Sequence, residues 1–131
     1  MAYRDFSEMP VWQLAADVVK DVYTLSSQLP RCEDYALRGQ QREAAVRNTG
    51  NIAEGFGRAH GKEKSNFYFF ARGSSYEVVS HLLVGCKAGY FTEDEVIPLK
   101  TKCLKIVEEL TKIVKLLSSS SGSPSNPKPQ P

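Results

Sequence analysis

Helical periodicity is the feature of this chain that most restricts its fold. Between Thr92 and Leu117, apolar side chains recur every three or four residues. That spacing is typical of the buried face of an amphipathic α-helix, in which 3.6 residues complete one turn. The apolar positions are Val96, Leu99, Cys103, Val107, Leu110, Val114 and Leu117. The segment is therefore predicted to be one helix that packs on a hydrophobic core.

Three earlier segments also have a helical pattern, and strand signals are scarce. They run from about Pro10 to Gln28, from about Asp34 to Gly55 and from about Lys62 to Ala88. Short connections between helices favour antiparallel neighbours. The sequence thus predicts an all-α protein, an antiparallel up-down-up-down four-helix bundle.

Local signals mark the ends of these helices and of the domain. Pro10 suits the first position of a helix, and Thr92 and Glu95 have the spacing of a capping box. Residues 118–131 are rich in serine and proline, a composition that favours disorder. We therefore expect a bundle domain over residues 1–117 and a disordered tail over 118–131.

Composition excludes several classes of protein. A chain of 131 residues fits one domain with its own core, and a net charge of +2 does not by itself indicate a nucleic-acid binder. The sequence lacks the apolar run of a signal peptide or a membrane span. We expect a soluble, cytoplasmic protein without membrane association. The three cysteines are far apart, and Cys103 is predicted to serve as a small core residue.

Polar side chains interrupt the apolar face of the second predicted helix. Asn48 and Asn51 share a narrow face with Ala44, Ile52 and Gly55. A buried amide without a hydrogen bond costs about 1–3 kcal/mol, so a neighbouring helix, another subunit or a ligand must satisfy it. We predict a structural polar network of Asn48, Asn51 and Glu54 that fixes how this helix meets its neighbours.

The third predicted helix is apolar on nearly every side. Such a helix is enclosed either by its own domain or by another subunit. Four helices cannot enclose one of their own members, which favours a homo-oligomer over a tolerated exposed patch. The candidate interface residues are Phe69, Tyr76, Val79 and Leu83.

Basic side chains gather along the second predicted helix and the turn after it. One interpretation is a solvated face, or arginines that pair with carboxylates of another subunit. The other is a patch that contacts phosphates, which a closed ring of subunits would repeat. The candidate nucleic-acid-binding residues are Arg31, Arg38, Arg42, Arg58, Lys62 and Lys64.

Catalytic patterns are missing from the sequence. Lys62 follows Gly61, but the spacing of the preceding glycines is not that of a phosphate-binding loop. His81 is interpreted as a hydrogen-bonded core or interface residue, and Glu54 has no paired carboxylate or metal-ligand cluster to make it a catalytic acid. We therefore expect no enzymatic activity, no cofactor and no metal site.

Several short motifs, in order, give the chain a resemblance to a known family from about Phe6 to Leu117. The most recognisable is Asn51-Ile52-Ala53-Glu54-Gly55. The others are Phe6-x-x-Met9-x-Val11-Trp12-Gln13-x-Ala15, Leu29-Pro30-x-x-Glu33-x-Tyr35-x-Leu37-x-x-Gln40, Ala71-x-Gly73-Ser74-x-x-Glu77 and Gly89-Tyr90-Phe91. The chain resembles the bacterial four-helix-bundle proteins encoded within intervening sequences of large-subunit ribosomal RNA genes.

The resemblance implies a ring, most simply a homopentamer. A similar fold occurs in the accessory variability determinant of diversity-generating retroelements, a basic pentamer that works with nucleic acid. By this analogy of fold we expect a non-enzymatic accessory factor associated with RNA or DNA. The alternative is a protein-interaction scaffold that recruits an unknown protein partner and binds no nucleic acid.

Overall fold

Four long helices make up the computed structural model, which describes residues 3–121, with side chains to residue 119. The helices are α1 (Pro10–Ser26), α2 (Leu37–Gly57), α3 (Gly61–Lys87) and α4 (Glu93–Ser121). Short 3-10 helices, η1 (Phe6–Glu8) and η2 (Arg31–Glu33), precede α1 and α2. No strand occurs within residues 3–121, so the prediction of an all-α four-helix protein is confirmed.

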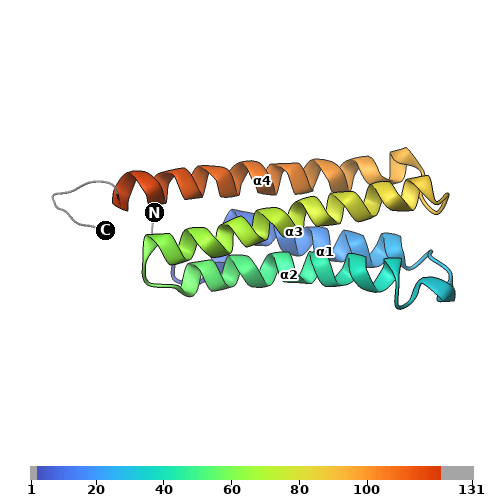
Figure 1. Ribbon diagram of the computed structural model, residues 1–131, viewed down its shortest axis with the longest axis horizontal. Helices are drawn as coiled ribbons and strands as arrows, with labels where there is room; N and C mark the ends of the chain where they lie inside the picture. Colours follow the sequence, from blue (N-terminus) through green and yellow to red (C-terminus); the bar gives the residue numbers. More distant parts are fainter. Residues whose placement is uncertain (1–2, 122–131) are drawn as a thin grey trace.

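Consecutive helices run in opposite directions (Figure 1). The α1–α2 loop and the α3–α4 turn lie at one end of the bundle, and the α2–α3 turn lies at the other. Contacts between helices agree with this order, since Asp21 of α1 bonds Lys102 of α4 and Arg47 of α2 bonds Glu77 of α3. Throughout the described part of the chain, every helix is too short or too polar to span a membrane.

The predicted signals at the helix ends act as expected. Pro10 opens α1. At the start of α4, the Thr92 N–H donates to Glu95 Oε1 (2.9 Å) and the Glu95 N–H donates to Thr92 Oγ1 (3.2 Å), so both halves of the capping box form. Gly89, in the α3–α4 turn, has a φ of 86°, a conformation that favours glycine.

Two boundaries differ from the prediction. α2 begins at Leu37 rather than near Asp34, because Arg31–Glu33 form the separate helix η2 and Ala36 has a non-helical backbone (φ −118°, ψ −108°). Glu33 then accepts a hydrogen bond from the Leu37 N–H (3.1 Å) and caps the new start. α4 continues through Ser121, so the first four residues of the predicted tail are helical. The rest of that tail lies outside the described residues.

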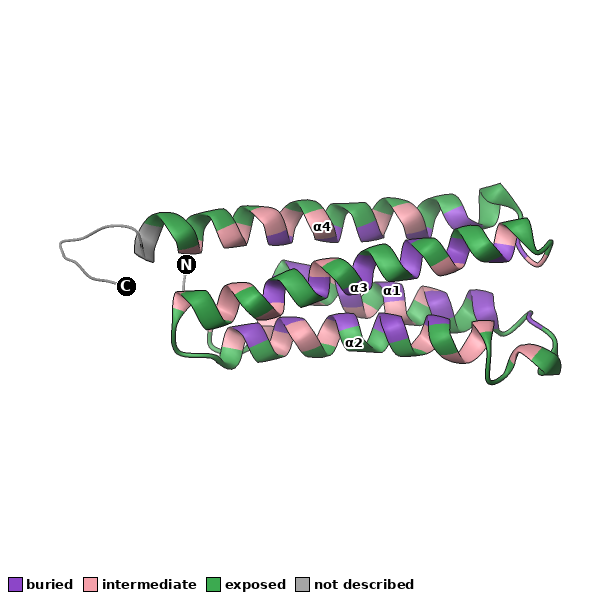
Figure 2. Cartoon of the chain, viewed as in Figure 1, coloured by how far each residue is buried: buried purple, intermediate pink, exposed green. Residues whose placement is uncertain are grey.

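The hydrophobic core lies along the axis between the four helices. Figure 2 shows buried positions on the inward sides of all four. The largest completely buried apolar side chains include Ile52 of α2, Leu82 of α3 and Ile106 of α4. Cys103 is also completely buried, and this burial raises the pKa of its thiol to about 12. Its predicted place in the core is confirmed.

Candidate functional site

The asparagines of α2 reach the serines of α3 inside the bundle. Asn48 Nδ2 donates to Ser75 Oγ over 2.7 Å, and neither residue has any exposed surface. Asn51, which is partly buried, donates to Ser74 Oγ over 3.5 Å. Inside the bundle, two side-chain hydrogen bonds at adjacent turns thus join α2 to α3, in addition to the Arg47–Glu77 pair on the surface.

Glu54 does not belong to this network, contrary to the prediction. Its side chain is 55% exposed and pairs with Arg58 over 3.0 Å along the surface of α2. The physical reason is angular position, because Glu54 lies away from the face that carries Asn48, Ile52 and Gly55.

Gln41 is a buried polar residue that the sequence prediction missed. Only 1% of its surface is exposed, and neither amide atom has a hydrogen-bond partner. The signal was present in the helical spacing, since Gln41 lies three residues before Ala44 and seven before Asn48 on the same face. Asn48 Oδ1 also has no partner. The interior of α2 therefore carries a row of amides that is only partly satisfied.

His81 is a mostly buried residue of α3 near the Arg47–Glu77 pair. Its side chain is 12% exposed, with Nε2 lying 4.0 Å from Glu77 Oε2, while Nδ1 is buried without a partner. Burial lowers the pKa of His81 and the charge of Arg47 acts in the same direction, whereas Glu77 opposes them.

Arg38 and Arg42 bind the carboxyl-terminal end of α1. Arg38, whose side chain is 14% exposed, donates to the carbonyls of Ser26 (3.1 Å), Leu29 and Pro30 (3.4 Å), and it pairs with Asp34. Arg42 donates to Ser26 Oγ (2.8 Å) and to the Tyr23 carbonyl (3.2 Å), and its guanidinium lies 4.3 Å from the centre of the Tyr23 ring. The carboxyl-terminal end of a helix leaves carbonyl groups without hydrogen-bond partners and carries a partial negative charge. The two guanidinium groups donate hydrogen bonds to these carbonyls and offset that charge.

The basic residues at the α2–α3 turn make a second, separate group. Lys64 Nζ donates to the carbonyls of Phe56 (2.7 Å) and Gly55 (3.3 Å) and thereby caps α2. Arg58 pairs with Glu54 and lies 4.6 Å from the centre of the Phe67 ring. Lys62 is exposed.

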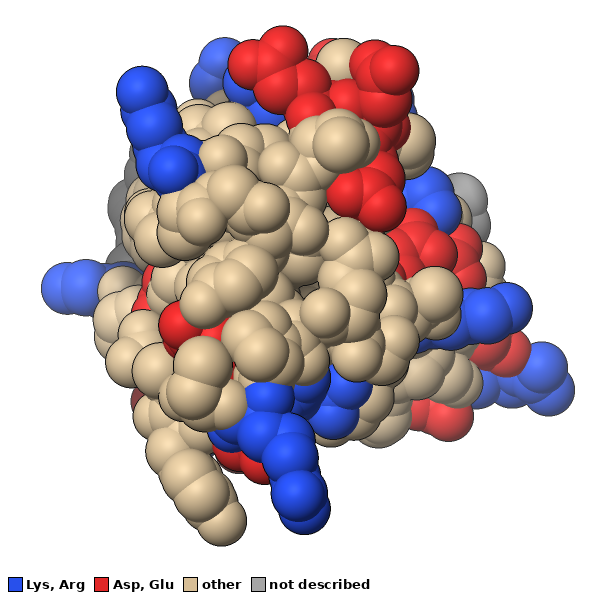
Figure 3. Space-filling view, turned by 90° about the vertical axis from the view of Figure 1, so that its right-hand side faces the viewer, with Lys and Arg blue, Asp and Glu red and all other residues tan. Residues whose placement is uncertain are grey.

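The six predicted phosphate-binding residues therefore do not form one patch. Arg31 of η2 and Arg38 and Arg42 in the first turns of α2 belong to the end with the α1–α2 loop, and the other three belong to the α2–α3 turn at the opposite end (Figure 1). Figure 3 looks onto the first of these ends and shows a broad uncharged surface between acidic and basic groups. Within residues 3–119, Arg31 and Lys62 are the two of the six whose side chains have no bonded partner or ring contact.

Apolar side chains gather on the outer face of α3. Phe69, Tyr76 and Leu83 are 46%, 51% and 44% exposed, and Ile97 and Leu104 of α4 are 53% and 41% exposed. The structure corrects one predicted member of this surface. Val79 is only 8% exposed because it packs in the hydrophobic core, so it is not available to another subunit.

Metal ligands do not converge in the described part of the chain. Within residues 3–119, no three His, Cys, Asp or Glu side chains lie close enough together to hold a metal ion. Cys32 is exposed, Cys86 is partly buried, and both are free thiols like Cys103.

Comparison with known proteins identifies the family. No curated protein matches the sequence. The model of the 23S rRNA-intervening sequence protein family matches residues 7–112, which include all of α1, α2 and α3 and most of α4. The chain belongs to the 23S rRNA-intervening sequence protein family.

Proposed function

We propose that this protein is a non-enzymatic accessory protein that works as a homo-oligomer, with subunits joined through the outer faces of α3 and α4. The observation that carries the proposal is the set of exposed apolar side chains on these two helices. Phe69, Tyr76 and Leu83 recur at intervals of seven residues on α3, and Ile97 and Leu104 recur at the same interval on α4. Intervals of seven place side chains in a stripe along a helix.

An exposed stripe of this kind favours burial by another subunit. Single exposed apolar residues are common on protein surfaces, but contiguous patches mark interaction sites. Gly73 lies on the same face of α3, and a Cβ placed there meets no atom within 4 Å. A neighbouring helix can therefore approach the α3 backbone closely at this point.

Light scattering coupled to size-exclusion chromatography tests the proposal. We expect a particle several times the 14.6 kDa chain mass, and five times that mass for the homopentamer that the family resemblance implies. Tyr76→Glu and Leu83→Glu should shift the protein toward the monomer, because each buries a carboxylate in the interface. Val46→Glu, at a residue 46% exposed on α2, is the matched control and should keep the wild-type mass. A wild-type monomer would overturn the proposal.

Association with RNA or DNA is the second candidate function, and the α2–α3 turn is the observation that favours it. Lys62 is exposed there, beside Arg58 and within the first turn of α3, where the helix end favours anions. Four of the six predicted contact residues are engaged within the chain, however, which leaves Arg31 and Lys62 of that set for phosphates. An oligomeric scaffold for a protein partner is therefore the better supported function.

Salt dependence separates these two functions. Binding through phosphates weakens steeply as salt rises, because each neutralised phosphate releases a counterion. If nucleic acid is the partner, Lys62→Glu should weaken binding of structured RNA at low salt, and the effect should fade as salt is added. A protein partner should instead remain bound after nuclease treatment.

A further inference from the structure

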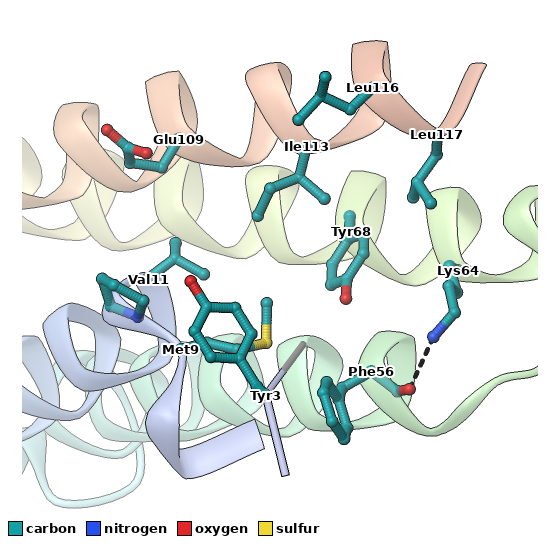
Figure 4. A pocket seen from close by; sticks show the side chains of 11 residues that line it. Tyr3, Met9, Val11, Phe56, Lys64, Tyr68, Glu109, Ile113, Leu116 and Leu117 are labelled. Atoms are coloured by element: carbon teal, nitrogen blue, oxygen red, sulfur yellow. Dashed lines mark hydrogen bonds between the residues drawn. The ribbon is translucent and has the colours of Figure 1, made fainter. Parts of the chain in front are cut away.

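A groove of about 420 Å³ lies at the end of the bundle that holds the α2–α3 turn, and no part of the proposed function uses it. Figure 4 shows its walls, which come from the segment before α1, the end of α2, the start of α3 and the last turns of α4. Binding sites for small molecules commonly have volumes of about 300–1,000 Å³. The groove therefore has the size of a ligand site.

Most of the lining is apolar. Met9 and Val11 at the start of α1, Phe56 of α2 and Ile113 of α4 contribute hydrophobic side chains from three separate segments of the chain. Only a few polar groups reach the space between them. A ligand that fits such a lining must itself be largely apolar, with its polar group at one defined point.

Tyr68 supplies the first of the polar groups. The residue is 3% exposed, and its hydroxyl points into the groove without a hydrogen-bond partner among the described residues (Figure 4). The ring is held in place against Gly55, where a Cβ would lie 2.6 Å from a ring carbon. The hydroxyl oxygen keeps contact with solvent and bonds no other described residue, so it is free to donate to an acceptor in the groove. Burial also raises the pKa of Tyr68, which keeps the hydroxyl protonated.

Lys64 supplies the second polar group, one turn earlier on α3. Its ammonium has three N–H donors, and the carbonyls of Gly55 and Phe56 accept two of them. One donor and the positive charge are left for the groove. The acidic residue at the opposite side, Glu109, pairs with Lys105 over 3.1 Å and makes no ion pair with Lys64.

We propose that this groove binds a small amphipathic anion, a molecule with an apolar chain or ring and a single carboxylate. The carboxylate accepts hydrogen bonds from the Tyr68 hydroxyl and the Lys64 ammonium. The apolar part lies between Met9, Val11 and Ile113. Hydrogen bonds from charged or preorganised donors to a carboxylate are stronger than those between neutral groups, which selects the anion over a neutral analogue.

Calorimetric titration of the full chain with decanoate tests this proposal. Decyltrimethylammonium has the same apolar chain with a positive head group, so it is the matched control ligand. We expect one decanoate site per chain and at least tenfold weaker binding of the cation. This comparison needs no variant protein, and equal affinities or binding that does not saturate would overturn the proposal.

Two pairs of variants identify the head-group site. Lys64→Met should remove the preference for the anion, whereas Lys62→Met, at an exposed lysine two residues away, should keep it. Tyr68→Phe should weaken decanoate binding about tenfold, the effect of one hydrogen bond to a charged group, and Tyr35→Phe, at a fully exposed tyrosine before α2, should not. Circular dichroism checks that each variant folds. If Lys64→Met unfolds because α2 loses its cap, the decanoate affinity of Tyr68→Phe decides the test. Unchanged affinity in Tyr68→Phe would overturn the assignment.

Other occupants of the groove give distinct results. Nuclear Overhauser effects between Ile113 and residues 122–131 in the free protein would show that the chain's own carboxyl-terminal segment fills the groove. A decanoate affinity that falls as the protein concentration rises would show that a second copy fills it. Either result overturns the assignment to a small molecule.

Discussion

Asn48 of α2 and Ser75 of α3 are joined by a 2.7 Å hydrogen bond in a part of the bundle from which solvent is fully excluded. Removing one partner leaves the other buried without a bond, which costs about 1–3 kcal/mol. Asn48→Ala should therefore lower the free energy of unfolding by about that amount, measured by urea denaturation.

Asn51→Ala is the matched control for this prediction. Its bond to Ser74 is longer, at 3.5 Å, and the residue is partly exposed, so water can replace the lost partner. We expect a loss below about 1 kcal/mol. Equal losses in the two variants would contradict the view that Asn48 is the main polar link between α2 and α3.

Glycine substitutions should separate close packing from helix propensity. A Cβ at Gly85 would lie 2.3 Å from the Phe91 ring, so Gly85→Ala should destabilise the protein by about 1–3 kcal/mol through overpacking. Gly50 is exposed on α2, and a Cβ there meets nothing within 4 Å. Gly50→Ala should stabilise by about 0.5–1 kcal/mol, since glycine weakens helix interiors. Thermal unfolding of both variants measures the two effects, and a stabilised Gly85→Ala protein would refute the packing argument.

Arg38 should not be replaceable by lysine. Its planar guanidinium bonds three carbonyls and Asp34 at once, a geometry that a single ammonium cannot reproduce. Arg38→Met and Arg38→Lys should each lower the free energy of unfolding by about 1.5–3 kcal/mol, the range for hydrogen bonds to a charged group. Arg31→Met, at an exposed residue of η2, is the control and should change it by less than about 0.5 kcal/mol. Full stability of Arg38→Lys in urea titrations would show that charge alone matters here.

His81 should make the protein sensitive to mild acid. Because the pKa of His81 is lowered from 6.5 in the folded state, the unfolded chain binds the additional proton first as the pH falls. The stability that neutral His81 contributes is thus present above pH 6.5 and is lost as the pH falls through the lowered folded-state value. His81→Gln should reduce the loss of stability between pH 7 and pH 5.5, measured by urea denaturation at each pH. His60→Gln is the control, because His60 is an exposed residue directly before α3. If the free energy of unfolding depends on pH equally in the two variants, the prediction is contradicted.

The helices could be predicted from the sequence because their signals are local. Pro10, the Thr92–Glu95 capping box and the apolar spacing each act within a few residues of the chain. The start of α2 could not be predicted in this way. The loop before it folds back until the Asp34 carbonyl lies 2.9 Å from the Cβ position of Gly39, a contact that helical periodicity does not encode.

The roles of the arginines were also beyond the reach of the sequence. Arg38 and Arg42 form a regular stripe on α2, but their acceptors are backbone carbonyls of α1, and every residue type has a carbonyl. Val79 was misassigned for a related reason. Periodicity places it near the edge of the apolar face, and only the packing of the whole bundle decides on which side of that edge it falls.

The arginine caps of α1 have a consequence for the order of folding. The last turn of α1 obtains its hydrogen bonds from side chains only 12 to 19 residues further along the chain, so closing that loop costs little entropy. Segments that combine short loops with strong contacts fold early. We therefore expect the α1–α2 loop to close early in folding, together with the shorter α2–α3 turn, across which Lys64 bonds carbonyls only eight and nine residues back.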